Sequence, residues 1–407
     1  MNDPAPHPAA LAGIRVLDLS RVLAGPWATQ ILGDLGAEII KVEKPGEGDD
    51  TRRWGPPFVT TAEGARGDAA YYLAANRNKR SVTVDLATPQ GAEIIRSLAP
   101  HCHILVENFK TGGLKKYGLD YESLRAANPA LVYCSITGFG QTGPYAKRPG
   151  YDYMIQAMGG LMSLTGEPNG EPMKAAVAVA DLFTGMYAIT AMLAALRHAE
   201  RTGQGQHIDI SLLDCQVAML ANLGLSYLVS GEAPQRLGNA HASVAPYQVF
   251  PTADGHVVVA VGNDTQFRDL CAATAAGIEN DIRFANNSGR IENRAALTAA
   301  LSAALARKPT AHWIAELERA NVPCGPINTL PQVFTDAHVQ ARGAVEMMQR
   351  KDGVSVPLIA DPIRMSETPP ASRRAPPLLG QDTGPVLRDL LRASDADLAR
   401  WRAAGVI

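Results

Sequence analysis

The alternation of strand-like and helix-like segments in the N-terminal third of the chain restricts its fold more than any other feature. Ile14–Leu19 is a short apolar run that predicts a buried strand. Pro26 suits the first turn of a helix that ends at Gly36, and Glu38–Val42 predicts the next strand. Further strands are predicted at residues 82–84, 104–106 and 131–136. Because strands that alternate with helices form parallel sheets, we expect an α/β, Rossmann-like domain.

The rest of the chain is less regular. Residues 51–77 are rich in glycine, proline and arginine without a clear period, so we expect an ordered surface loop. His207–Ser211 alternates like a strand, and a helix is predicted from Leu212 to about Val229. Residues 231–246 are polar and contain glycine, which predicts a linker or an active-site loop. A second unit is predicted to begin with a hairpin across Ala253–Gly255.

The charge of the chain is nearly balanced, with a formal net charge of −2 over 407 residues. No global basic field calls for nucleic acid or an anionic membrane, so neither is expected as a partner. The five cysteines are scattered without a CxxC pair, which favours reduced thiols and a cytoplasmic location. The N-terminus lacks the basic and apolar regions of a secretory signal.

The apolar stretch from Ala175 to Leu196 contains one acid, Asp181, at the start of a predicted helix. The stretch is long enough to span a membrane, but polar residues interrupt it, so we expect a buried helix. A carboxylate at a helix start can accept hydrogen bonds from free backbone N–H groups, and the helix dipole keeps it ionised. Asp181 is therefore either an ordinary helix cap or a charged carboxylate held for chemistry.

The first strand–helix turn argues against a dinucleotide site. Ser20–Pro26 lacks the GxGxxG sequence that lets a pyrophosphate approach the backbone. Glu43, after the second predicted strand, does stand where an acid would bind the ribose. Without the glycines, NAD binding is disfavoured.

Two further clusters each have two interpretations. His101–His103 could supply metal ligands, but no further ligand set accompanies it, so solvated turn residues are favoured and no metal site is expected. The basic residues of Asn76–Arg80, and Lys110, Lys115 and Lys116, are predicted near the carboxyl edge of the sheet. They could bind phosphate there or form a solvated face.

Several segments match a known family in order and span nearly the whole chain. They are Gly13–Ser20, Ala24–Pro26, Leu35–Glu43, Asn76–Ser81, Val106–Phe109, Gly150–Asp152 and Pro376–Gly380. With these segments the chain resembles the class III CoA-transferases, the CaiB/BaiF family. The resemblance implies an enzyme that moves CoA from an acyl-CoA donor to a free carboxylic acid. Its CoA thioesters are substrates, and no permanently bound cofactor is implied.

The resemblance also implies roles for single residues. Asp181 would attack the thioester to form a mixed anhydride, from which the CoA thiolate would make an aspartyl-CoA thioester. CoA contacts carry over to Val22, Leu23, Ala24, Lys44, Val84, Asn108, Phe109, Lys116 and Tyr151. At two positions the chain departs from the family. Lys44 stands where an arginine is common and keeps the charge. Ala87 replaces a lysine of formyl-CoA transferase, so phosphate binding must differ at Ala87.

Other features bear on the acid that is used. Trp54–Phe58 and Tyr71–Leu73 resemble the branch that passes CoA from succinyl-CoA to dicarboxylic acids. An acyl-CoA racemase or epimerase is an alternative function. Tyr151 argues against it, because the racemases of the family have an acid/base histidine at this position and a tyrosine is a poor base. His241–Val244 replaces the polyglycine loop of the formyl-CoA:oxalate-type transferases, which are another alternative. A catalytically silent CoA-binding protein is a third. We expect the distal carboxylate of a dicarboxylic acid to meet Arg236, His241 or Ser243.

The family fold implies a division of the chain into domains. Residues 1–225 would form the N-terminal part of a large Rossmann-like domain, residues 230–335 a smaller α+β domain, and residues 340–407 a C-terminal segment that returns to the large domain. The family also implies an intertwined, interlocked homodimer. The expected partners are then acyl-CoA, small carboxylic acids and a second copy of the chain.

Overall fold

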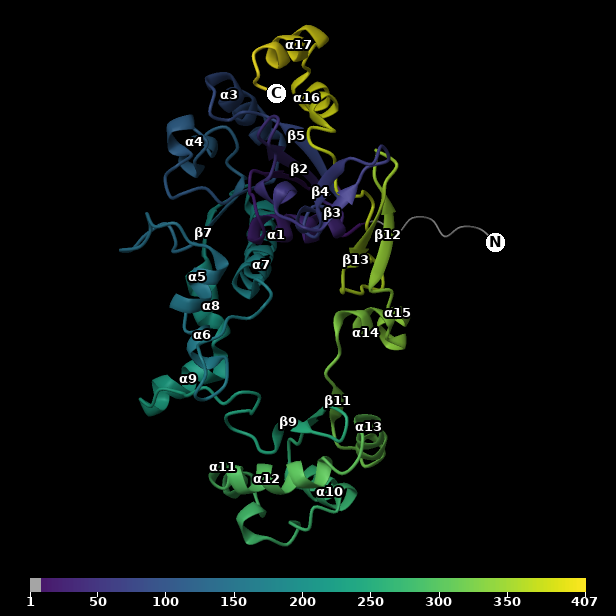
Figure 1. The fold of residues 1–407 in the computed structure, drawn as a ribbon. Helices are drawn as coiled ribbons and strands as arrows, with labels where there is room; N and C mark the ends of the chain where they lie inside the picture. Colours follow the sequence, from purple (N-terminus) through teal and green to yellow (C-terminus); the bar gives the residue numbers. More distant parts are fainter. Residues whose placement is uncertain (1–8) are drawn as a thin grey trace. The chain divides into compact units, whose positions relative to one another are not determined.

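The computed structural model describes residues 9–407, which divide into two compact units. The first unit contains the described residues up to Leu161, together with Ala175–Leu225 and His338–Ile407. The second contains Met162–Lys174 and Ser226–Ala337. Figure 1 shows the course of the chain through both.

The segment of residues 162–174 departs from the predicted division, which placed it in the large domain. It belongs to the second unit because its backbone is bound there. The N–H of Gly238 donates to the carbonyl of Gly166 at 3.1 Å. The guanidinium of Arg236 donates to the carbonyls of Glu167 at 3.2 Å and Gly170 at 2.7 Å.

The first unit is built on a parallel sheet that has six strands within residues 9–407. These are β1 (Arg15–Asp18), β2 (Glu38–Glu43), β5 (Lys79–Thr83), β6 (Ile104–Glu107), β7 (Val132–Thr137) and β8 (His207–Ser211). Their order is β5-β2-β1-β6-β7-β8, and every neighbouring pair is parallel. This is the 3-2-1-4-5-6 order of the Rossmann fold, whose topological switch point lies between β1 and β6. The predicted fold class is confirmed.

Helices cover both faces of this sheet because neighbouring residues of its strands point to opposite sides. Val16 packs in a core with helices α1 (Ala24–Asp34) and α7 (Val179–Thr202). Leu17 packs in a second core with α3 (Pro89–Leu98) and with the C-terminal helices α16 (Thr383–Leu391) and α17 (Asp395–Ala403). In Figure 1 the yellow C-terminal helices lie beside α3, and α7 lies beside α1.

The segment predicted as an ordered surface loop, residues 51–77, has more helix and strand than expected. It contains η1 (Asp50–Arg53), β3 (Phe58–Thr60), β4 (Arg66–Ala69) and α2 (Ala70–Leu73). The prediction failed because Arg52 and Tyr72, which read as surface residues, are buried. The Arg52 guanidinium lies 3.7 Å from the centre of the Tyr72 ring and is paired with Glu43 at 2.7 Å.

The helix predicted from Leu212 to Val229 is two helices, α8 (Leu212–Met219) and α9 (Ala221–Ser230), which bend by 76°. Ala221 stands at the break with a φ of 45°, a left-handed conformation that ends an α-helix. The apolar periodicity continues through the break, which is why the pattern alone did not reveal it.

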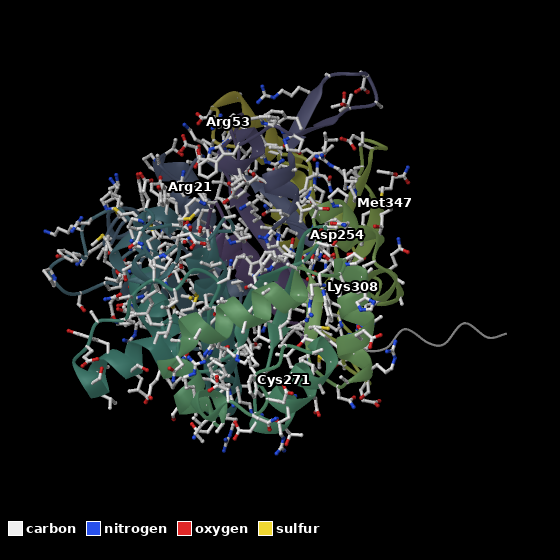
Figure 2. All side chains as sticks on the ribbon, turned by 60° about the horizontal axis from the view of Figure 1, so that its bottom comes forward. Arg21, Arg53, Asp254, Cys271, Lys308 and Met347 are labelled. Atoms are coloured by element: carbon white, nitrogen blue, oxygen red, sulfur yellow. The ribbon has the colours of Figure 1, made fainter. Side chains whose placement is uncertain are left out.

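The second unit has a small antiparallel sheet ordered β11-β10-β9, with β9 (Tyr247–Pro251), β10 (His256–Ala260) and β11 (Cys324–Pro326). Its core includes residues of α10 (Asp264–Thr274), α12 (Arg294–Leu305) and α13 (Thr310–Arg319). Asp254 in the β9–β10 turn accepts the N–H of Thr310 at 2.8 Å, and the Lys308 carbonyl accepts the N–H of Ala253 at 3.0 Å. Figure 2 labels Asp254 and Lys308 among the side chains of this unit.

The remaining elements are short. They are η2 (Ala99–His101), η3 (Lys115–Tyr117), α4 (Tyr121–Leu124), α5 (Asp152–Met158), α6 (Leu161–Leu164), η4 (Ile282–Phe284), α11 (Asn287–Glu292), α14 (Leu330–Thr335), α15 (Ala337–Ala341), and the hairpin of β12 (Val345–Gln349) and β13 (Ser355–Ile359).

Among the described residues, α7 is the one unbroken helix long and apolar enough to cross a membrane, and the bent pair α8–α9 also passes that test. Such a result is weak evidence, because the core helix of a globular domain passes it as well. α7 packs against α1 and the sheet, as expected for a core helix.

Candidate active site

Asp181 occupies the first turn of α7 but does not cap it. The N-cap residue is Ala178, which has no polar side chain to offer. The cap comes from Asp152, the first residue of α5, whose Oδ1 accepts the N–H groups of Ala180 at 2.8 Å and of Asp181 at 3.2 Å. The interpretation of Asp181 as an ordinary helix cap is therefore wrong. Its carboxylate is available for another role.

The protonation of Asp181 also differs from the expectation that the helix dipole keeps it ionised. Burial raises the pKa of Asp181, and the negative charge of Asp152 raises it further, to about 7. Asp152 already occupies the N–H groups that would have stabilised the Asp181 carboxylate. A carboxyl group with a pKa near neutral in a buried position is typical of a reactive site.

A close helix contact brings Asp181 to the first turn of the Rossmann sheet. Gly185, one helical turn after Asp181, faces the start of α1. A Cβ at Gly185 would lie 2.9 Å from the carbonyl oxygen of Ala24 and 3.2 Å from Cδ1 of Trp27. Only glycine lets the two helices approach so closely, and the turn Val22–Ala24 therefore lies beside the N-terminal end of α7.

The same turn is fixed from the other side by neighbouring strands. Val22 has a φ of 71°, which is a strained conformation for a β-branched residue and costs about 1–3 kcal/mol. Its N–H donates to Asp49, with both carboxylate oxygens at 3.3 Å. The side chain of Asn108 binds both main-chain groups of Arg21, at 2.9 and 2.7 Å. Asn108 follows β6, so this contact spans the switch point between β1 and β6.

The remaining residues predicted to bind CoA in this unit follow the carboxyl ends of the strands. Lys44 and Lys116 are exposed; Lys44 pairs with Glu47 at 2.5 Å, and the Lys116 ammonium lies 4.6 Å from the Tyr117 ring centre. Phe109 is half-buried, and the Arg21 guanidinium lies 5.7 Å from its ring centre. Val84 is 2% exposed, and its N–H donates to the carbonyl of Glu43 at 2.9 Å.

Comparison with known proteins identifies the family. The family model described as CoA-transferase family III matches residues 11–383. The chain belongs to CoA-transferase family III. The resemblance found in the sequence is therefore confirmed, and the protein is a CoA-transferase.

Curated relatives and solved structures of similar length agree. The transferase is 52% identical over 391 residues to the succinate–glutarate CoA-transferase of Agrobacterium fabrum, covering 96% of this chain and 98% of that one. It is 43% identical over 398 residues to the human succinyl-CoA:glutarate CoA-transferase, covering 98% and 90%. A crystal structure of a CaiB/BaiF family protein from Brucella suis matches with a TM-score of 0.82 at 51% identity, covering 93% and 99%.

Two side chains near Asp181 were not assigned a role from the sequence of this transferase. One is Asp152, described above. The other is Tyr71, whose pKa is raised to about 12 by burial and then by the charges of Asp181, Asp152 and Asp49. Tyr71 therefore lies in the same electrostatic environment as Asp181, and its ring packs edge-on against Trp54 at 5.6 Å. The sequence marked Tyr71 only as part of a matching segment.

Tyr151 precedes Asp152 at the start of α5 and is 65% exposed. The candidate acid-binding residues Arg236, His241 and Ser243 belong to the second unit. Two donors of the Arg236 guanidinium already bind backbone carbonyls of residues 167 and 170. Nδ1 of His241 accepts the N–H of Ser243 at 3.1 Å, so a neutral His241 carries its proton on Nε2.

Two other predictions about charged residues of the transferase need correction. Glu43, placed as a ribose-binding acid, is buried in its ion pair with Arg52. The basic segment Asn76–Arg80 is neither a solvated face nor a phosphate site along its length, because Arg77 pairs with Asp34 at 2.6 Å and Lys79 with Asp18 at 3.1 Å in the interior. These cations are buried because each pairs with a buried carboxylate. A local sequence pattern does not show which carboxylates will be buried beside them.

Proposed function

We propose that this transferase moves CoA from succinyl-CoA to a dicarboxylic acid such as glutarate, with Asp181 as the nucleophile. The observation that carries the proposal is the half-buried carboxyl group of Asp181, which does not cap its own helix and lies beside the turn Val22–Ala24. The names of relatives at 52% and 43% identity, which include succinate or succinyl-CoA and glutarate, support the choice of donor and acceptor.

The proposed reaction exchanges one thioester for another. The Asp181 carboxylate attacks the succinyl carbonyl, the C–S bond breaks, and a succinyl–aspartyl anhydride and the CoA thiolate form. The thiolate attacks the aspartyl carbonyl, which releases succinate and leaves an aspartyl-CoA thioester. The carboxylate of the acceptor acid attacks this thioester to give a second anhydride and free thiolate. Attack of the thiolate on the acceptor's carbonyl yields the new acyl-CoA and restores Asp181.

The setting of Asp181 suits this sequence. Water would hydrolyse each acyl intermediate, so burial of the nucleophile protects them. A pKa of about 7 leaves about half of the Asp181 side chains ionised at neutral pH.

We propose that the distal carboxylate of the acid is bound by His241, Ser243 and Arg236. Nε2–H of His241 and the hydroxyl of Ser243 can each donate to a carboxylate. Arg236 holds the backbone of residues 167 and 170 and would add the charge of its guanidinium. Replacement of His241 by Ala should raise the KM for glutarate and leave the KM for succinyl-CoA little changed. An unchanged KM for glutarate would remove His241 from this role.

We further infer that the transferase acts as a homodimer. In the single chain, α7, α8 and α9 expose Phe183, Met186, Tyr187, Val217 and Leu225, each 40–61% accessible. Exposed apolar groups on neighbouring helices are typical of an interface between proteins. The mass in solution, measured by light scattering, should be twice that of the chain, and a monomer would contradict the inference.

The test of the proposed function is CoA exchange from succinyl-CoA to a panel of free acids, followed by mass spectrometry. Wild-type protein should form glutaryl-CoA, and Asp181→Ala should not. With glutarate labelled by oxygen-18 in its carboxylates, one labelled oxygen should enter Asp181 and appear later in released succinate. Product formed equally by Asp181→Ala would refute the mechanism. Product formed from other acids but not from glutarate would correct the acceptor alone.

A further inference from the structure

The β1–α1 turn, residues 20–23, is held almost entirely by side chains from other parts of the sheet. The N–H of Ser20 donates to Oδ1 of Asp18 at 3.0 Å. The carbonyl of Ser20 accepts from Nζ of Lys41 at 3.0 Å. The next residue, Arg21, has both main-chain groups bound by the amide of Asn108. Each of these contacts fixes one peptide plane of the turn.

Asp49 makes the contact that controls the unusual conformation of Val22. Its two oxygens accept the N–H of Val22 at 3.3 Å, and its Oδ1 also accepts the N–H and hydroxyl of Thr51. Val22 has a φ of 71°, a region that glycine adopts freely but that a β-branched side chain avoids. The chain therefore keeps valine in a glycine-like conformation by binding its N–H to a charged group.

The charges beneath the turn lie in the interior. Lys41 pairs with Asp49 at 2.9 Å, and the side chains of both residues have no exposed surface. Buried ion pairs stabilise a fold no better than apolar side chains of similar size do, so their presence here calls for a reason other than stability. Burial would raise the pKa of Asp49, but Lys41 and the hydrogen bonds lower it to about 2, so Asp49 stays charged near neutral pH.

We propose that Asp49, held by Lys41, is a positioning residue for CoA. It locks Val22 in the left-handed conformation and so presets the β1–α1 turn for the incoming CoA thioester. This inference rests on the proposed function, because it takes this turn as part of the CoA site. The charges of Asp49 and of Asp181 both raise the pKa of Tyr71, so Asp49 lies in the same region of the protein as the nucleophile.

The test compares CoA affinity with catalysis in Asp49→Asn. The substitution weakens a charge-assisted hydrogen bond, so the Kd for CoA, measured by calorimetry, and the KM for succinyl-CoA should each rise about tenfold. The KM for the acceptor acid should change little, because the turn is not proposed to touch it. If the single variant does not fold, Lys41→Met combined with Asp49→Asn leaves no such pair half broken. Because it also removes the contact of Lys41 with the Ser20 carbonyl, the loss of CoA affinity should be at least as large.

A rescue separates positioning from general stability. Val22→Gly in the Asp49→Asn background removes the strain that Asp49 opposes, and it should restore at least half of the lost CoA affinity on a logarithmic scale. Asp34→Asn is the matched control. It breaks the ion pair with Arg77, which is buried like that of Asp49 but lies at the other end of α1. The control should lower the melting temperature without a change in CoA affinity.

Three results would overturn the inference: wild-type CoA affinity in Asp49→Asn, equal losses of CoA affinity in Asp49→Asn and Asp34→Asn, or no recovery with Val22→Gly. A wild-type protein that binds CoA but transfers none would refute the proposed function, while the Kd values would still decide the role of Asp49. A wild-type protein that does not bind CoA would refute both.

Discussion

The raised pKa of Asp181 predicts how the rate of CoA transfer depends on pH. Only the ionised carboxylate can attack a thioester, and burial together with Asp152 raises the pKa of Asp181 to about 7. About one tenth of the enzyme is then active at pH 6 and about nine tenths at pH 8. The kcat/KM for succinyl-CoA should therefore rise about tenfold between these values and level off above them.

Asp152→Asn tests the cause of that profile. Asparagine keeps an oxygen that can accept the N–H groups of Ala180 and Asp181, so the cap is retained while the charge is lost. The pKa of Asp181 should fall below 7. Because burial is the larger of the two causes, it should stay above about 5.4, halfway to the value of 3.8 from which it was raised.

The assay is an initial-rate pH profile from pH 5 to 9, read by product mass, for wild type, Asp152→Asn and Asp214→Asn. Asp214 is an acid in the first turn of another helix, α8, and does not contribute to the pKa of Asp181, so its variant should keep the wild-type midpoint. A wild-type rate independent of pH between 5.5 and 8.5, or a midpoint unmoved in Asp152→Asn, would refute the reasoning.

The same pKa has a consequence for stability with a definite sign. The folded-state pKa of Asp181 lies above its unfolded value, so the folded state binds the extra proton. This contribution is fully present below about pH 4 and is lost as the pH rises through 7. Asp181→Asn should therefore be more stable than wild type at pH 8, by at most ~4 kcal/mol, and the partial exposure of Asp181 reduces that limit. The same difference in stability between Asp181→Asn and wild type at pH 5 and at pH 8 would contradict the argument that burial raises the pKa of Asp181.

Two further predictions concern packing and a second buried acid. Gly185→Ala places a methyl group 2.9 Å from the carbonyl oxygen of Ala24. The free energy of unfolding, measured in urea, should fall by about 1–3 kcal/mol, and the KM for succinyl-CoA should rise because the turn moves. Unchanged values of both would show that α1 can shift without an effect on stability or on CoA binding. Burial raises the pKa of Glu107 to about 7. Glu107→Gln can still accept the N–H of Phe109, so it should raise the melting temperature relative to wild type at pH 8 but not at pH 4. An equal change in melting temperature at both pH values would exclude titration of Glu107 as the cause.

Much of the large unit was predictable because its signals are local. Apolar runs bounded by turn residues located β1, β2, β6 and β7 to within about two residues. A threonine followed by proline is typical of a helix start, and Thr88 caps α3 through the N–H of Gly91 at 2.9 Å, with Pro89 in the first turn. The alternation of strand and helix then led to a parallel sheet, because few other arrangements bury such strands on both faces.

The errors have a common physical origin in contacts between distant segments. Residues 51–77 looked like a surface loop because arginine is usually solvated, yet Glu43 and the backbone of Pro377 take up the donors of Arg52. The helix pattern from Leu212 continued past its break, because apolar spacing says nothing about a left-handed residue such as Ala221. In both cases the decisive partner or conformation is absent from the local pattern.

For the active site, the sequence by itself determined which residue could act as the nucleophile: a lone acid at the start of an apolar helix, in a chain with the ordered segments of family III CoA-transferases. Only the tertiary structure decided the state of that residue. Three contacts join segments that are far apart along the chain: the cap supplied by Asp152, the close approach at Gly185, and the hydrogen bond from Val22 to Asp49. A pKa and a backbone strain depend on burial and on neighbouring charges, and those exist only once the chain has folded.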